Sequence, residues 1–280
     1  MDNIRMAARV CQGSFRRILY MPRFYIAFLW LLFLYFPLMN AVRSFSAAVG
    51  IGMAPWMFPF LTDDSGSQLF IILGALLLFC DAPFLNQNSS WQILRAGRKN
   101  WFWGNMAYIW LLSLVYAAIL SLLPVLLMIP HLEWTAEWGK VLGTLAQTNA
   151  LGIRLNYTIM AHYTPAAAML LTLAAVWLNT VLIGMINFTL NLLVKKGIGA
   201  AVSVAVGLSP LLIVRLARFD LGYYFAPPLW MDLSNYRWQG YGYGPSFAYV
   251  YGVLLGCIGV CTILSLAGIR RKDLNFTEEV

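Results

Sequence analysis

Long apolar stretches with almost no charge alternate with shorter polar segments along the chain. The hydrocarbon core of a bilayer, about 30 Å thick, needs about 20 apolar residues in a helix. Strands of a membrane barrel would instead alternate apolar and polar residues over about 10 positions. Six continuous runs fit the helical pattern: Phe24–Val42, Gln68–Leu85, Asn105–Pro130, Pro165–Val194, Ile198–Val214 and Phe247–Ile269. The pattern predicts an all-α membrane protein with six transmembrane helices.

The first 21 residues follow a different pattern, because apolar residues recur there every three or four positions and arginines fill much of the rest. The apolar set is Ile4, Ala7, Ala8, Cys11, Phe15, Ile18 and Leu19. Such a basic amphipathic helix lies along the cytoplasmic membrane surface. A disordered basic tail that only sets topology is the alternative. We therefore expect an interfacial helix (1–21), a transmembrane domain (22–270) and a cytoplasmic tail (271–280).

Composition agrees with this class, since 61% of the residues are hydrophobic and only 11% are charged. Soluble domains average about 25% charged residues. The net charge of +8 does not indicate a nucleic-acid partner, because most of the 19 basic residues fall on one side of the six-helix topology. Cytoplasmic segments carry such an excess of Lys and Arg. We expect both termini to lie in the cytoplasm and membrane lipid to be the partner of the apolar surface.

The longest predicted cytoplasmic loop, residues 86–104, has the features of a short structured element. Ser89 or Ser90 can cap a helix and Gly97 can end it. Trp91, Leu94 and Arg95 would then share one helix face. The segment is either an interfacial helix that only touches lipid or a docking element for a cytoplasmic protein, because Trp and Arg are common hot-spot residues.

Residues that could carry chemistry are scarce. No GxxxxGK[ST] phosphate loop is present, and neither His131 nor His162 belongs to a metal-ligand motif. Ser209 lies in an apolar run without a histidine or lysine in any run to activate it. The four cysteines do not indicate a disulfide framework. We therefore do not expect an enzyme, a metal site or a cofactor bound by this chain.

Polar residues inside the apolar runs are the remaining candidates. Asp81, followed by Pro83, lies near the cytoplasmic end of the second run. We favour a role in ordering the turn into residues 86–104 over proton coupling. The fourth run carries polar residues that cluster on one side of a helix, either to hydrogen-bond between helices or to line a translocation pathway. They are Thr172, Asn179, Thr180, Asn187 and Asn191.

Three segments together carry a family resemblance: residues 78–84 (LFCDAPF), 95–99 (RAGRK) and 101–108 (WFWGNMAY). They resemble membrane subunits of ABC-2-type ABC transporters from Gram-positive bacteria. The layout is also similar, with a basic N-terminal helix, six spans, a cytoplasmic loop after the second span and a short basic tail. The resemblance implies a multi-pass permease in the bacterial plasma membrane.

The resemblance also implies partners. Two permease subunits, either two copies or a copy and a paralogue, would pair with two ABC ATPase subunits, which would bind ATP and magnesium. The loop after the second span would couple to the ATPase through five residues: Trp91, Leu94, Arg95, Arg98 and Lys99. Asp81 and Pro83 would shape the approach to this loop. Export of a peptide, including an antimicrobial peptide or immunity to one, is the favoured activity, with lipid-linked glycans and drugs as alternatives.

The main competing function is a secondary, ion-coupled transporter that works without an ATPase. It would predict internal repeats and charged or broken helices at mid-membrane. We find no convincing repeat and no charge at the centre of a predicted span. A membrane enzyme and a purely structural partner are further alternatives.

Overall fold

The computed structural model describes residues 2–84, 89–148, 155–217, 220–237 and 244–271. Regular structure in these ranges is helical apart from one bridge between Met53 and Leu132. The α-helices are α1 (Asp2–Ile18), α2 (Pro22–Val49), α3 (Phe58–Leu61), α4 (Ser65–Phe79), α5 (Ser89–Ala96), α6 (Arg98–Met128), α7 (Lys140–Thr148), α8 (Tyr157–His162), α9 (Pro165–Leu193), α10 (Ile198–Leu211) and α11 (Phe247–Arg271). A π-helical turn, η2 (Leu212–Ala217), continues α10, and the 3-10 segments η3 (Asp220–Tyr224), η4 (Pro227–Met231) and η5 (Leu233–Asn235) precede α11.

The all-helical class is confirmed, and each of the six apolar runs contains a helix. Four helices, α2, α6, α9 and α11, are long and apolar enough to cross a membrane. The other two, α4 and α10, have 15 and 14 residues. At 1.5 Å per residue each extends little more than about 20 Å, which is less than the hydrocarbon core of about 30 Å. The chain is thus a membrane protein with four candidate spanning helices, and six spans stay a prediction.

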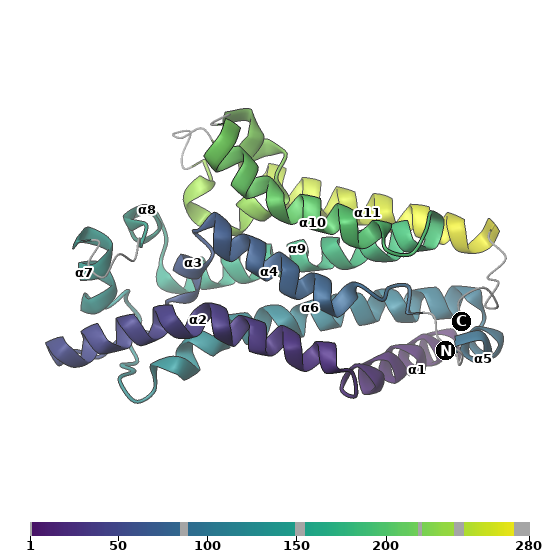
Figure 1. Cartoon of the computed structure of the whole chain (residues 1–280), viewed down its shortest axis with the longest axis horizontal. Helices are drawn as coiled ribbons and strands as arrows, with labels where there is room; N and C mark the ends of the chain where they lie inside the picture. The colour runs from purple at the N-terminus through teal and green to yellow at the C-terminus, as the bar shows by residue number, and fades with distance from the viewer. Residues whose placement is uncertain (1, 85–88, 149–154, 218–219, 238–243, 272–280) are drawn as a thin grey trace.

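The long helices lie side by side along the longest axis of the molecule (Figure 1). The helices α1 and α5 and the end of α11 lie at one end, which we call the α5 end. At the other end lie α3, α7 and α8, and we call it the α8 end. The shorter helices α4 and α10 lie along part of the same axis.

The segment between α2 and α4 is largely buried inside the protein. The helix α2 continues to Val49 and ends at Gly50, whose φ of +70° is left-handed. Beyond it, Met53, Met57 and Phe58 are fully buried. Irregular backbone is tolerated at membrane depth only where protein surrounds it. The buried segment can therefore lie beside the short helix α4 without exposing its backbone to lipid.

The central helix of the bundle is α9. In its apolar window 61% of the residues are buried, against 39% in α6 and 28% in both α2 and α11. Small residues bring neighbours close to it, as at Gly184, where a Cβ atom would lie 2.7 Å from Ile109 and 3.3 Å from Phe79. Helices in membranes associate through such close packing rather than through the hydrophobic effect. The polar side chains of α9 are therefore placed inside the protein.

The N-terminal helix α1 packs on the first turns of α6. At the contact, a Cβ atom on Gly104 would lie 2.7 Å from the Ala7 carbonyl oxygen and 2.7 Å from Val10. The α6 helix has 31 residues, a length of about 46 Å, so it exceeds one membrane crossing and can carry α1 outside the hydrocarbon. The apolar side of α1 thus faces protein, although Ile4 and Leu19 are exposed. Its predicted position on the membrane surface stays a prediction.

We expect Gly104→Ala to loosen α1 from α6, because the backbone of Ala7 cannot move away as a flexible side chain would. Cys11 reports this change, since it is buried in the contact and burial raises the pKa of its thiol. In a background that keeps Cys11 and replaces the other three cysteines, maleimide labelling should become at least about tenfold faster. The matched control is Gly13→Ala, because no atom lies within 4 Å of a Cβ there. Equal labelling in both variants would contradict the close α1–α6 contact.

Candidate functional site at the α5 end

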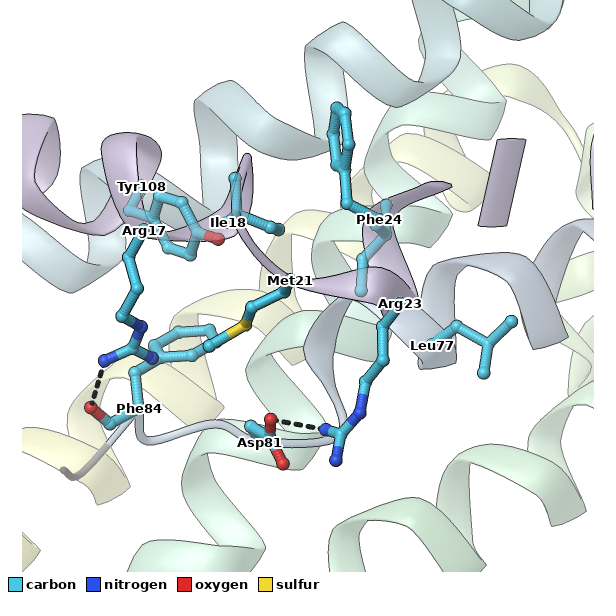
Figure 2. Close-up of a pocket in the computed structure, with 10 residues that line it drawn as sticks. Arg17, Ile18, Met21, Arg23, Phe24, Leu77, Asp81, Phe84 and Tyr108 are labelled. Carbon is cyan, nitrogen blue, oxygen red and sulfur yellow. Dashed lines mark hydrogen bonds and ion pairs between the residues drawn. The ribbon is translucent and has the colours of Figure 1, made fainter. Parts of the chain in front are cut away.

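The turn that leaves α4 is built around Asp81. Its carboxylate forms an ion pair with Arg23 at the start of α2 (Figure 2). Its carbonyl oxygen accepts a hydrogen bond from the Phe84 amide at 2.7 Å, and Phe84 takes a left-handed φ of +61°. The ion pair is half-exposed, with side-chain exposures of 48% and 38%, so solvent screens it. Asp81 therefore joins two helices, in agreement with an ordering role.

A small pocket next to this ion pair lies where α1, α2, α4 and α6 meet (Figure 2). Arg17 of α1 donates to the carbonyl oxygen of Phe84 at 3.3 Å. The Phe84 ring meets Tyr108 edge to face, with centroids 5.1 Å apart. Partial burial lowers the pKa of Arg17, but a guanidinium remains charged at any physiological pH. The arginines of α1 and α2 thus hold the turn as well as contributing to the basic charge.

Asn191 of α9 is the third tie to this turn. Its Nδ2 atom donates to the Ala82 carbonyl at 2.7 Å. Its Oδ1 atom accepts from the amides of Gly197 and Gly199, at 3.1 and 3.0 Å. One buried amide thereby connects the end of α4, the end of α9 and the start of α10. Asn191 has a structural role that accounts for its polarity.

The other polar residues of α9 are also buried. Asn179 and Thr180 bond to carbonyl groups of their own helix, and Asn187 donates to Ser203 of α10 at 2.7 Å. Within the described residues, the side-chain oxygens Thr172 Oγ1 and Asn187 Oδ1 are buried without a hydrogen-bond partner. These positions favour helix packing over an open pathway, and pathway lining stays a prediction.

The helix predicted within residues 86–104 is α5, and it ends at Gly97 as the sequence indicates. Residues 86–88 and the side chain of Trp91 lie outside the described part of the chain. Ile93 points inward and is 8% exposed, whereas Leu94 is 76% exposed. The next residue, Arg95, is exposed too. Together, Leu94 and Arg95 form a projecting pair, which we call the α5 ridge.

The remaining two predicted coupling residues, Arg98 and Lys99, begin α6. Lys99 is exposed, whereas Arg98 donates to the carbonyl of Ile269 in α11 at 3.4 Å. Asn100 fixes the α5–α6 junction, because its Nδ2 atom donates to Ala96 at 2.8 Å and to Asn3 of α1 at 3.2 Å. Arg98 is thus a helix-joining residue, and the α5 ridge and Lys99 are the parts of the predicted set that project.

The sequence analysis used Arg17 and Arg23 only as part of the basic charge that predicts the orientation of the chain, and it missed their contacts with the turn. The contact of Arg23 could have been predicted. Consecutive apolar helices that run in opposite directions bring the start of the first beside the end of the second, and these positions hold Arg23 and Asp81. Nothing comparable indicated that Arg17 would reach the Phe84 carbonyl.

Comparison with protein-family models, with curated proteins and with solved structures gave no match. The family resemblance therefore rests on the residues quoted above. Among the described residues, no group of three or more His, Cys, Asp or Glu side chains comes together as a metal site.

We expect Asn191→Ala to lower the free energy of unfolding by about 1–3 kcal/mol, because it removes the side-chain partner of two buried backbone groups, the Ala82 carbonyl and the Gly199 amide. Asp81→Asn should cost less than about 1 kcal/mol, the range of exposed ion pairs. Reversible unfolding in mixed detergent measures both. The matched control is Asn179→Ala, which removes the same side chain from α9 but loses only a bond within the helix. A smaller loss for Asn191→Ala than for Asn179→Ala would contradict the assigned tie.

Proposed function

We propose that this chain is the permease subunit of an ABC-2-type transporter, driven by an ATPase on a separate chain. The observation that carries the proposal is the α5 ridge. It stands at the bundle end that holds the α1 arginines, next to the segments in which the sequence resembles such permeases. On this proposal α5 is the helix that receives motion from the ATPase.

The α5 ridge has the chemistry of a protein contact. Leu94 exposes three quarters of an apolar side chain in a basic region that cytoplasmic water or lipid headgroups would otherwise surround. Arg95 beside it adds a long charged side chain of the type enriched at interface hot spots. Ile93 packs inward and anchors the helix. A partner with an apolar recess and acidic residues would fit this pair.

The contacts of the preceding turn provide a route from α5 into the bundle. Residues 80–84 are tied to α2 through Asp81 and Arg23, to α1 through Arg17, and to α9 through Asn191. Displacement of α5 therefore acts on three helices together. ATP-dependent closure of the partner could shift the bundle between two states if the partner binds those states with different affinities.

The remaining parts of the proposal follow the resemblance. We propose six spans with both termini in the cytoplasm of a bacterial cell, a second permease copy or a paralogue in the complex, and ATP with magnesium on the ATPase. The substrate class is an amphipathic molecule such as a peptide. It rests on the resemblance, because the aromatic side chains near the start of α11 are packed inside the protein, with Tyr236 stacked on Phe247 and Trp230 edge to face with Tyr249.

We expect Leu94→Glu and Arg95→Glu each to weaken binding of the ATPase by about 2 kcal/mol or more, the scale of an interface hot spot. The ATPase would be an ABC protein recovered with the tagged chain from its native membranes. The measurements are its affinity for the chain in nanodiscs and its rate of ATP hydrolysis. Arg98 is not a clean test site, because it contacts Ile269.

Gln92→Glu is the matched control, because it adds a negative charge to another exposed position of α5. It should leave ATPase binding within about twofold of the unchanged chain. Transport that persists without any ABC ATPase would support the ion-coupled alternative. Unchanged ATPase binding in both ridge variants would contradict the proposal that α5 is the coupling helix.

Topology is tested with single cysteines in a chain whose native cysteines are replaced. Lys140→Cys lies on α7 at the α8 end, and Lys195→Cys lies in the turn between α9 and α10; both positions are exposed. In intact cells we expect a membrane-impermeant maleimide to label Lys140→Cys, and Lys195→Cys only after permeabilisation. The reverse pattern, or labelling of both from outside, would contradict the proposed orientation.

A further inference from the structure

A second polar cluster lies at the α8 end, between the α3–α4 turn and the segment that joins η4 to η5. Asp232 is only 3% exposed. The amide of Ser234 donates to its Oδ1 atom at 2.7 Å, and the Ser234 hydroxyl lies 2.8 Å from its Oδ2 atom. The same hydroxyl lies 3.5 Å from Oδ1 of Asp63. Two acidic residues 169 positions apart in the sequence thus meet at one serine.

The Ser234 hydroxyl thus brings the carboxyl groups of Asp63 and Asp232 close together, at 3.5 Å and 2.8 Å from the same oxygen atom. Two ionised carboxylates at this spacing repel each other, and a proton on one of them removes the repulsion. Burial raises the pKa of Asp232 well above its usual range, and the charge of Asp63 adds to this effect. Burial raises the pKa of Asp63 as well.

A neutral bond ties the same two segments together. The hydroxyl of Thr62 lies 3.0 Å from the carbonyl oxygen of Met231 and 3.0 Å from that of Pro59. Gln68 donates to the Thr62 carbonyl at 2.9 Å, and Thr62 is fully buried. The α3–α4 turn and the η4–η5 segment therefore share one contact that does not titrate beside the one that does.

A further acid and two tyrosines are among the titratable groups that interact with the pair. Asp64 adjoins Asp63 and its negative charge raises the pKa of Asp63 further. Tyr163, at the end of α8, and Tyr236, at the end of η5, lie close enough to Asp232 for its charge to act on them. Burial raises the pKa of Tyr163 to about 12 and that of Tyr236 further still, so both tyrosines stay neutral near pH 7.

We propose that Asp63 and Asp232 bind one proton between them and form a protonation-controlled clasp that holds the α3–α4 turn to the η4–η5 segment. Loss of the proton leaves two carboxylates in contact, and their repulsion opens the clasp. Since folding raises the pKa of the pair above the unfolded value near 4, the added stability is complete below that value. It is lost as the pH rises through the raised value, so the clasp is closed in acid and open in base.

Hydrogen exchange on the full chain in lipid nanodiscs tests the clasp. We expect protection of the amides in residues 58–68 and 226–236 to fall by at least about tenfold between about pH 5 and pH 8, after correction for intrinsic exchange. Asp63→Asn and Asp232→Asn should each remove this pH dependence, because an amide does not titrate and can still donate a hydrogen bond. Difference infrared spectra should show one protonated carboxyl group at acidic pH that each variant loses.

The matched control is Asp64→Asn, which alters the neighbouring exposed acid that caps α4 and should keep the pH dependence. Protection that does not change with pH in the unmodified chain would overturn the proposal, and so would pH dependence that survives in both pair variants. If added calcium restores the protection of both segments at constant basic pH, the pair binds a cation rather than a proton, and the proposal is overturned. None of these outcomes depends on an ATPase or a substrate, so the clasp and the proposed function fail separately.

Discussion

The absence of water in the hydrocarbon core is the constraint on which the structure depends, because every polar group placed there must find a partner in the protein. The helix α9 shows how this works. It carries more buried polar side chains than its neighbours and is also the most buried of the four long helices. Thr189 bonds within its own helix and to Ser265 of α11 at 2.8 Å, while Asn187 reaches α10 and Asn191 reaches the end of α4. Surrounding α9 with other helices gives these three side chains their partners and defines the centre of the bundle.

Periodicity and hydropathy were sufficient to locate the long helices, but they did not predict the short helices α3, α7 and α8. The starts of α9 and α10 match the predicted starts, Pro165 and Ile198, because a proline and a glycine break the helical pattern there. The end of α2 differs, because the first apolar run ends at Val42 and the helix continues through Arg43 to Val49. A single charged side chain ends an apolar run without ending the helix.

The candidate site was only partly visible in the sequence. Short-range features, such as Gly97 at the end of α5, follow from backbone chemistry and could be predicted. Contacts between distant segments could not. The pair formed by Asp63 and Asp232 joins two regions that each look like ordinary polar loops, and only the fold brings them together. The sequence also does not predict that Leu94 is exposed while Ile93 is buried, because this depends on how α5 packs against α1 and α6.

The two ends of the bundle are linked by α4. This 15-residue helix starts beside Asp63 and ends beside Asp81. At its start Thr62 and Asp63 contact the η4–η5 segment, and at its end an arginine and an asparagine hold the following turn to α2 and α9. A helix moves largely as one body, because its backbone hydrogen bonds run along its length. The contacts at the two ends of α4 are therefore joined by a single rigid element of the fold.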